Sequence, residues 1–105
     1  MNNIIKTDFE TIKEHRGEIR KIAKGVDVLN ITSKKGSRRA DHFHKFSSHL
    51  CKLLFGKMLY FERPANSQIK PIKLEINPGD YFYSKNMVEH SMIFLENSND
   101  IYKCS

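Results

Sequence analysis

Apolar side chains recur at every second position in many short segments of this chain. A period of two places them on one face of a β-strand, with polar residues on the other. Eight segments show the pattern: "GEIRKIA", "VDVLNITS", "HLCKLLF", "KMLYFE", "KPIKLEI", "YFYS", "SMIFLE" and "DIYKC". Such spacing is typical of an all-β sandwich or barrel. No helix is required, although residues 7–16, "TDFETIKEHR", could form one short turn of helix.

Turn-forming residues separate these segments. Gly, Pro, Asn and Asp gather in "SKKGS" at 33–37, "FG" at 55–56, "RPANSQ" at 63–68, "NPGD" at 77–80 and "ENSND" at 96–100. These residue types supply the dihedral angles of tight turns. No internal repeat or shift in composition divides the 105 residues, so we expect one domain over 1–105. Its strands must close on themselves or pack as two sheets to avoid exposed edges.

Composition and charge exclude several classes of protein. The chain is 39% hydrophobic and 29% charged, which is ordinary for a globular domain. No apolar run is long enough for a signal peptide or a membrane span, which predicts a cytoplasmic protein. Cys51 and Cys104 are too few and too far apart for a disulfide framework. The net charge of +6 is spread along the chain, with "SKKGSRR" as its one cluster, so we expect no nucleic-acid or membrane partner.

Four histidines stand out as candidate metal ligands. His42 and His44 would point to the same face of a strand, and His49 follows after the short turn "KFSS". His90 lies far along the chain, just before the apolar segment "SMIFLE". As neutral ligands, converging imidazoles suit a divalent transition ion such as zinc, iron, manganese or nickel.

The spacing around the first three histidines resembles the first motif of the cupins. That motif has a glycine, five residues, His-x-His, three or four residues, a glutamate, six residues and a glycine. Gly36, His42, His44 and Gly56 stand at these positions, and His49 stands where the glutamate would be. The resemblance implies a single antiparallel jelly-roll barrel with a metal held by the histidines and the glutamate position.

The second cupin motif is matched in part between residues 79 and 94. Gly79 and His90 fit, whereas Lys85, Met87 and Phe94 replace its Pro, Gly and Asn. The resemblance covers residues 18 to 104 and implies frequent dimers. Similar cupins usually continue beyond the strand at "DIYKCS", which suggests a shortened member with a less closed barrel.

Replacing the glutamate by His49 changes the expected ligand. Four neutral imidazoles would leave the charge of the cation uncompensated, which favours a small anionic ligand, with a polyhydroxylated one as the other candidate. Two alternatives stay open, namely that three histidines ligate the ion, or that the pocket is polar and free of metal. Whether the site catalyses a reaction or only binds a ligand also stays open.

A second resemblance suggests a different chemistry. "RADHFHK" is similar to the R-G-x-H-x-H-K stretch of cupin-type nucleotide-sugar 3,4-ketoisomerases and related epimerases, with Ala40 in place of the glycine. By that resemblance the barrel needs no metal, His44 or His42 is the base, and Arg39 and Lys45 help to bind the nucleotide.

Such a reaction also needs a hydrogen-bond donor for the enolate oxygen, and Tyr81 and Tyr83 are candidates. On the opposite face from His49, Leu50 and Leu54 are too apolar for open solvent. Covering by the N-terminal strands or by a second subunit would account for that face, and the cupin resemblance favours a homodimer.

Overall fold

The computed structural model describes residues 10–21, 28–42 and 48–104, and for residues 41, 42 and 104 it describes the backbone alone. Within these ranges all regular structure is β, which confirms the predicted class. The strands are β1 (Glu10–Glu14), β2 (Gly17–Lys21), β3 (Val28–Ser33), β4 (Arg38–His42), β5 (His49–Phe55), β6 (Met58–Pro64), β7 (Ile72–Ile76), β8 (Tyr81–Ser84), β9 (Val88–Phe94) and β10 (Ser98–Cys104). The same part of the chain has no helix long and apolar enough to span a membrane.

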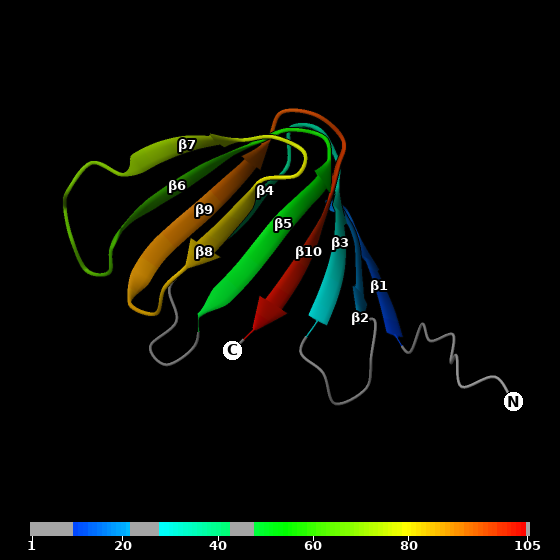
Figure 1. The fold of residues 1–105 in the computed structure, drawn as a ribbon, viewed down its shortest axis with the longest axis horizontal. Helices are drawn as coiled ribbons and strands as arrows, with labels where there is room; N and C mark the ends of the chain where they lie inside the picture. Colours follow the sequence, from blue (N-terminus) through cyan, green and yellow to red (C-terminus); the bar gives the residue numbers. More distant parts are fainter. Residues whose placement is uncertain (1–9, 22–27, 43–47, 105) are drawn as a thin grey trace, which may run out of the picture.

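The strands form two antiparallel sheets (Figure 1), ordered β1-β2-β3-β10-β5-β8 and β4-β9-β6-β7. From β3 to β10 the chain behaves as one long hairpin with its tip between β6 and β7. Its successive pairs, β3 with β10, β4 with β9, β5 with β8 and β6 with β7, lie alternately in the large and the small sheet. This is the double winding of a jelly roll, in which the two sheets face each other and do not close into a full barrel.

The N-terminal residues correct one expectation. Residues 10–14 form β1 and pair with β2, with Ile12 opposite Ile19, so the predicted helical turn is wrong for the described residues. Pairing lets Ile12 share the apolar face of the sheet. The hairpin extends the large sheet beside β3 (Figure 1).

The core lies between the two sheets and follows the predicted alternation. In β5 the side chains of His49, Cys51 and Leu53 are buried, whereas that of Leu50, which follows His49, is exposed. Tyr60 from β6 and Phe94 from β9 meet them from the small sheet, each about 1% exposed. The two-residue period therefore identified the inward face correctly.

Left-handed backbone occurs at the glycine positions of the two cupin motifs. Gly36, Gly56 and Gly79 have φ angles of 85°, 98° and 91°. Ala40, which replaces the glycine of the ketoisomerase stretch, and Met87, which replaces the glycine of the second cupin motif, also have positive φ, at 72° and 60°. The chain therefore keeps the turn geometry of the motifs where it has lost the glycine, at a cost in strain.

Candidate ligand cavity and histidine cluster

A cavity of about 340 Å³ lies between the sheets, lined by β2, β3 and β10 on one side and by β4 and β9 on the other. Arg16, Arg39, Asp100 and His90 supply polar groups to its lining. Its apolar walls come mainly from Ile19, Leu29, Ile31 and Met92. The volume is at the lower end of the range for small-molecule sites.

His90 is buried in the lining of this cavity and is held by neighbouring groups. Its Nδ1 lies 3.1 Å from Oγ of Ser84 and 3.4 Å from the carbonyl oxygen of Val88. The Tyr60 hydroxyl donates to Ser84 Oγ at 2.9 Å, and burial raises the pKa of Tyr60 to about 12, so it stays a donor. Because a carbonyl can only accept, the Val88 contact favours a hydrogen on Nδ1. Nε2 of His90 then keeps its lone pair.

His49 lies beside His90, at the start of β5. The two rings have centroids 6.3 Å apart and are tilted by 59°. His49 also stacks on Tyr102 of β10, with centroids 4.6 Å apart, which fixes the plane of its ring. The jelly-roll winding thus brings together two of the four predicted ligands, 41 residues apart.

The other two predicted ligands are located only in part. The backbone of His42 pairs with His90 across β4 and β9, next to a bulge that begins at Ala40. The side chain of His42, together with His44 and Lys45, lies outside the described residues. Among the side chains that are described, no group of three His, Cys, Asp or Glu residues could hold a metal ion.

Arg39 lies in the cavity wall with its guanidinium held on several sides. It donates to Glu14 at 2.6 Å, to Ser33 Oγ at 2.7 Å and to the carbonyl of Thr32 at 3.1 Å. Glu14 also pairs with Arg16, and these contacts lower the pKa of the Glu14 carboxyl. Arg39, a candidate phosphate-binding residue in the second resemblance, therefore connects β4 to the N-terminal hairpin.

Asp100 is a site residue that the sequence did not reveal. In the sequence Asp100 ends the turn segment "ENSND" and begins the apolar segment "DIYKC"; β10 begins two residues earlier, at Ser98, and Asp100 faces the cavity. It is 2% exposed, and burial raises its pKa to about 7 although the charge of Arg39 opposes that change. Only knowledge of where β10 begins would have placed it inward.

The proposed oxyanion donors are corrected by the structure. Tyr81 and Tyr83 are 64% and 50% exposed and point away from the cavity, because the inward positions of β8 are Phe82 and Ser84. Ser84 is the residue that β8 contributes beside His90. Ser84 pairs with His49 across β5 and β8, a register that the sequence alone did not indicate.

No family model and no curated protein matches the chain. Several solved structures match the chain. CapF, the capsular polysaccharide assembling protein of Staphylococcus aureus, has a TM-score of 0.80, 17% identity and matches over 90% of this chain and 29% of its own. The dTDP-4-dehydrorhamnose 3,5-epimerase of Sulfolobus tokodaii has a TM-score of 0.64, 20% identity and matches over 90% of this chain and 65% of its own.

Oxalate decarboxylase of Bacillus subtilis, described with Mn(II) centres, has a TM-score of 0.73, 17% identity and matches over 96% of this chain and 30% of its own. The present chain thus spans less than a third of CapF and of the decarboxylase, and just under two thirds of the epimerase. At these identities the likeness concerns the fold, which is that of the cupins. Cupins with this fold include a manganese protein and a sugar-nucleotide epimerase.

Proposed function

Because the chain has the cupin fold, we propose that it binds a divalent transition-metal ion through His42, His44, His49 and His90. A small anionic or polyhydroxylated ligand binds, or is transformed, in the adjoining cavity. The observation that carries the proposal is the setting of His90. Its Nδ1 contacts Ser84 and the Val88 carbonyl, so that Nε2 keeps a lone pair, as in metal-ligating histidines whose other ring nitrogen donates to an oxygen.

The spacing of His49 and His90 fits a shared ion after a small adjustment. With metal–nitrogen distances of about 2.0–2.1 Å, two imidazole centroids around one tetrahedral ion lie about 5 Å apart. The observed separation is 6.3 Å, so the rings would have to approach each other slightly. A bound ion would supply a Lewis acid at the histidine end of the cavity.

The chain's own residues would orient the ligand. Ser84 fixes the His90 ring, and Tyr102 fixes that of His49. Asp100 lines the cavity, and its side-chain carboxylate can accept a hydrogen bond from a ligand hydroxyl. A polyhydroxylated ligand fits this cavity because the lining offers guanidinium donors from Arg16 and Arg39 together with the Asp100 acceptor.

The test is metal analysis of the purified protein after reconstitution with zinc, iron, manganese and nickel in turn. We expect about one ion per chain, lost in the His90→Ala variant because a ligand and its supporting contacts are removed together. His15→Ala is the control, since His15 lies in the exposed turn between β1 and β2. Absence of metal under all four conditions would contradict the proposal.

The second candidate is a metal-independent nucleotide-sugar isomerase or epimerase. It is favoured by Arg39 and His90 in the lining of the same cavity, which place a cation beside a buried imidazole. In this case the protein, treated with a chelator, would exchange a sugar proton next to a carbonyl for solvent deuterium. His44→Asn would stop the exchange if His44 is the base. Binding of sugar nucleotides without exchange would indicate a non-catalytic ligand-binding cupin.

A further inference from the structure

The outer face of the large sheet carries an exposed apolar and basic surface far from the cavity lining. Strand register arranges six outward side chains as two rows across β8, β5 and β10. We call these six the outer-sheet patch: Tyr83, Leu50 and Lys103 in one row, and Tyr81, Lys52 and Ile101 in the other. Each row therefore combines an aromatic, an aliphatic and a cationic side chain.

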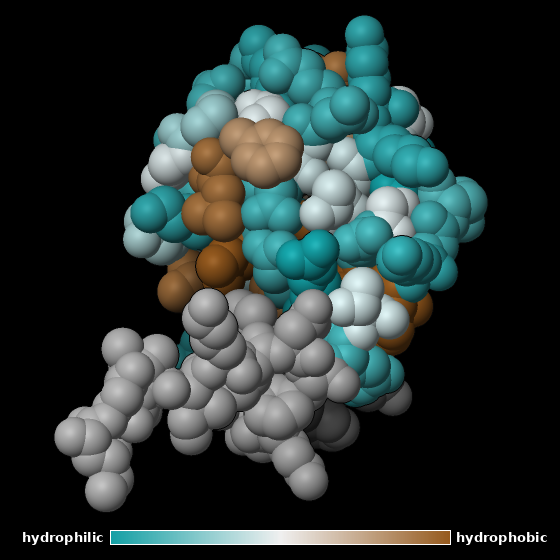
Figure 2. All heavy atoms as spheres, turned by 90° about the vertical axis from the view of Figure 1, so that its right-hand side faces the viewer, coloured by the Kyte–Doolittle hydropathy of each residue, from teal (hydrophilic) through white to brown (hydrophobic). Residues whose placement is uncertain are grey.

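The apolar members of the patch are strongly exposed. Tyr81 is 64% exposed, Tyr83 50% and Leu50 43%. Leu54, at the next outward position of β5, is 41% exposed and extends the same surface. Figure 2 shows a strip of hydrophobic side chains, within a mainly hydrophilic surface, on the side of the molecule that it presents. Apolar groups gathered in this way mark interaction sites.

The charge of the patch has one sign. Among the described residues, neither Lys52 nor Lys103 forms an ion pair, whereas Lys21 and Lys57 pair with glutamates. The ammonium group of Lys52 instead lies 5.0 Å from the centroid of the Tyr81 ring. The outward positions of β5, β8 and β10 include no acidic residue.

The described N-terminal strands do not cover this surface. The hairpin β1–β2 joins the large sheet edge to edge beside β3, on the far side of β10 from β5 and β8. A second copy is a poor fit, because a two-fold interface would set a patch with two lysines and no carboxylate against itself. A nucleic acid is also a poor fit, because four of the six patch residues are aliphatic or aromatic and only two cations are available for phosphates.

We propose that the outer-sheet patch docks an acidic segment of a partner protein that also carries apolar side chains. Leu50, Tyr81 and Tyr83 would contact its apolar side chains, and Lys52 and Lys103 its carboxylates. β8 is an edge strand of the large sheet, so an extended segment could also pair with its free edge. The patch has six residues, whereas a standard interface has about 20–30 on each side. The complex is therefore transient.

The probe is a fluorescein-labelled synthetic peptide of about 12 residues, long enough to cross the sheet, in which Glu alternates with Leu or Tyr. Binding is followed by fluorescence anisotropy at two salt concentrations. A peptide with Gln in place of Glu is the matched control for charge. We expect the acidic peptide to bind about tenfold more tightly than the Gln peptide, and more weakly as salt rises.

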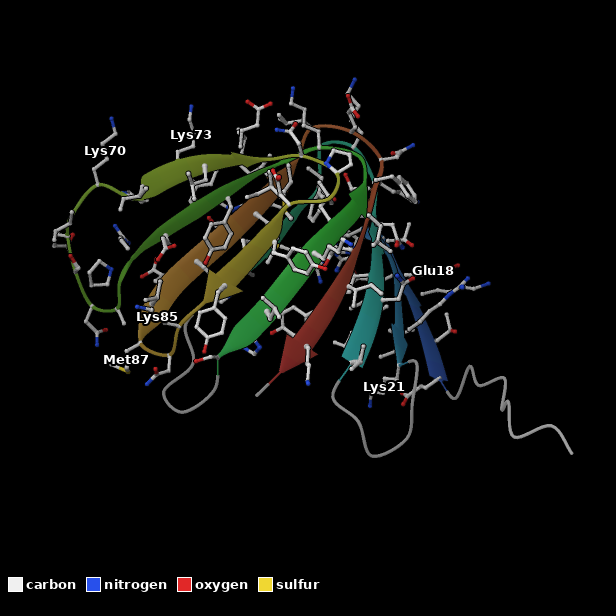
Figure 3. The ribbon with its side chains drawn as sticks, in the orientation of Figure 1. Glu18, Lys21, Lys70, Lys73, Lys85 and Met87 are labelled. Carbon is white, nitrogen blue, oxygen red and sulfur yellow. The ribbon has the colours of Figure 1, made fainter. Side chains whose placement is uncertain are left out.

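Two double variants localise the site with the same change in net charge. Lys52→Glu with Lys103→Glu should weaken binding by about tenfold or more, because two attractive charges become repulsive. Lys70→Glu with Lys73→Glu is the control, since these lysines belong to the β7 region of the other sheet (Figure 3), and it should change binding less than about twofold. Tyr83→Ser should also weaken binding through lost apolar contact. Circular dichroism checks that each variant is folded.

Several outcomes would overturn the proposal. They are no binding of the acidic peptide, equal weakening by the two double variants, and displacement of the peptide by single-stranded DNA at physiological salt. Sedimentation supplies another: a dimer that Leu50→Glu dissociates would assign the patch to a second copy of this chain. These results are independent of the metal analysis, because the patch faces away from the cavity.

Discussion

Replacing Gly56 by alanine tests how the first cupin motif closes the fold. Gly56 lies in the turn between β5 and β6 with a φ of 98°. A Cβ there would lie 2.1 Å from Oγ of Ser98, 2.6 Å from Cα of Ser98 and 2.6 Å from the carbonyl oxygen of Asn97. Ser98 cannot easily retreat, because it pairs with Ser33 across β3 and β10 and accepts a hydrogen bond from the amide of Lys57.

Two terms determine how much the Gly56→Ala substitution lowers the free energy of unfolding. Left-handed backbone in a residue with a Cβ costs about 1–2 kcal/mol. Forcing a methyl group into packed atoms costs about 1–3 kcal/mol more. The free energy of unfolding should therefore fall by about 2–5 kcal/mol, a large share of the roughly 5–15 kcal/mol that holds a domain folded. Adding Ser98→Gly should not restore stability, because two of the three close atoms belong to the backbone.

Gly79→Ala separates the two terms. Gly79 has a φ of 91°, but no atom lies within 4 Å of the position its Cβ would take. It should therefore lose only about 1–2 kcal/mol. Urea unfolding followed by circular dichroism measures both variants, since the chain has no tryptophan for fluorescence. Equal losses would refute the clash at Gly56, and no loss at Gly79 would refute the strain.

Three further predictions concern the site. Arg39→Met should lower the free energy of unfolding by about 1–3 kcal/mol in urea titrations, because the buried Ser33 hydroxyl and the Thr32 carbonyl lose their donor while Glu14 keeps its pairing with Arg16. No change would mean that these contacts are not formed. The pKa of Asp100 rises from its ordinary 3.8 to about 7 on folding, so the free energy of unfolding should fall between about pH 4 and pH 7, where the ionised form replaces the protonated one. Asp100→Asn should flatten that part of the pH profile. His49→Glu should keep the ion bound and shift the metal preference of the site toward manganese in competition assays. His49→Ala should weaken metal binding less than His42→Ala does. Unchanged metal binding in both His49 variants would show that His49 is not a ligand.

Most of the strand content could be predicted from the sequence, because a buried face imposes a period of two. "HLCKLLF" and "YFYS" coincide with β5 and β8. The period fails where a strand has no apolar alternation, as in β4 with its sequence "RRADH", and near the N-terminus, where "TDFETIKEHR" also fits a helical turn. In both places pairing with a distant partner, β9 or β2, decides the conformation.

The candidate site was predictable only where a motif fixed it. The cupin spacing predicted that His49 and His90 share one site, and in the structure their ring centroids lie 6.3 Å apart. It did not indicate Asp100, because a polar residue beside a turn sequence gives no sign of burial. It also suggested Tyr83 for the site, whereas inward parity on β8 selects Ser84.

The sequence by itself determined the class of fold, the inward face of strands such as β5 and the glycine turns, because each depends on residues close together in the chain. Only the tertiary structure decided which side chains meet. Double winding sets β5 beside β10 and places β9 across the core, so Tyr102 stacks on His49, Ser84 contacts His90 and Asp100 is buried near Arg39. These contacts join residues far apart in sequence, and their pairing follows from sheet order and register, which no local pattern encodes.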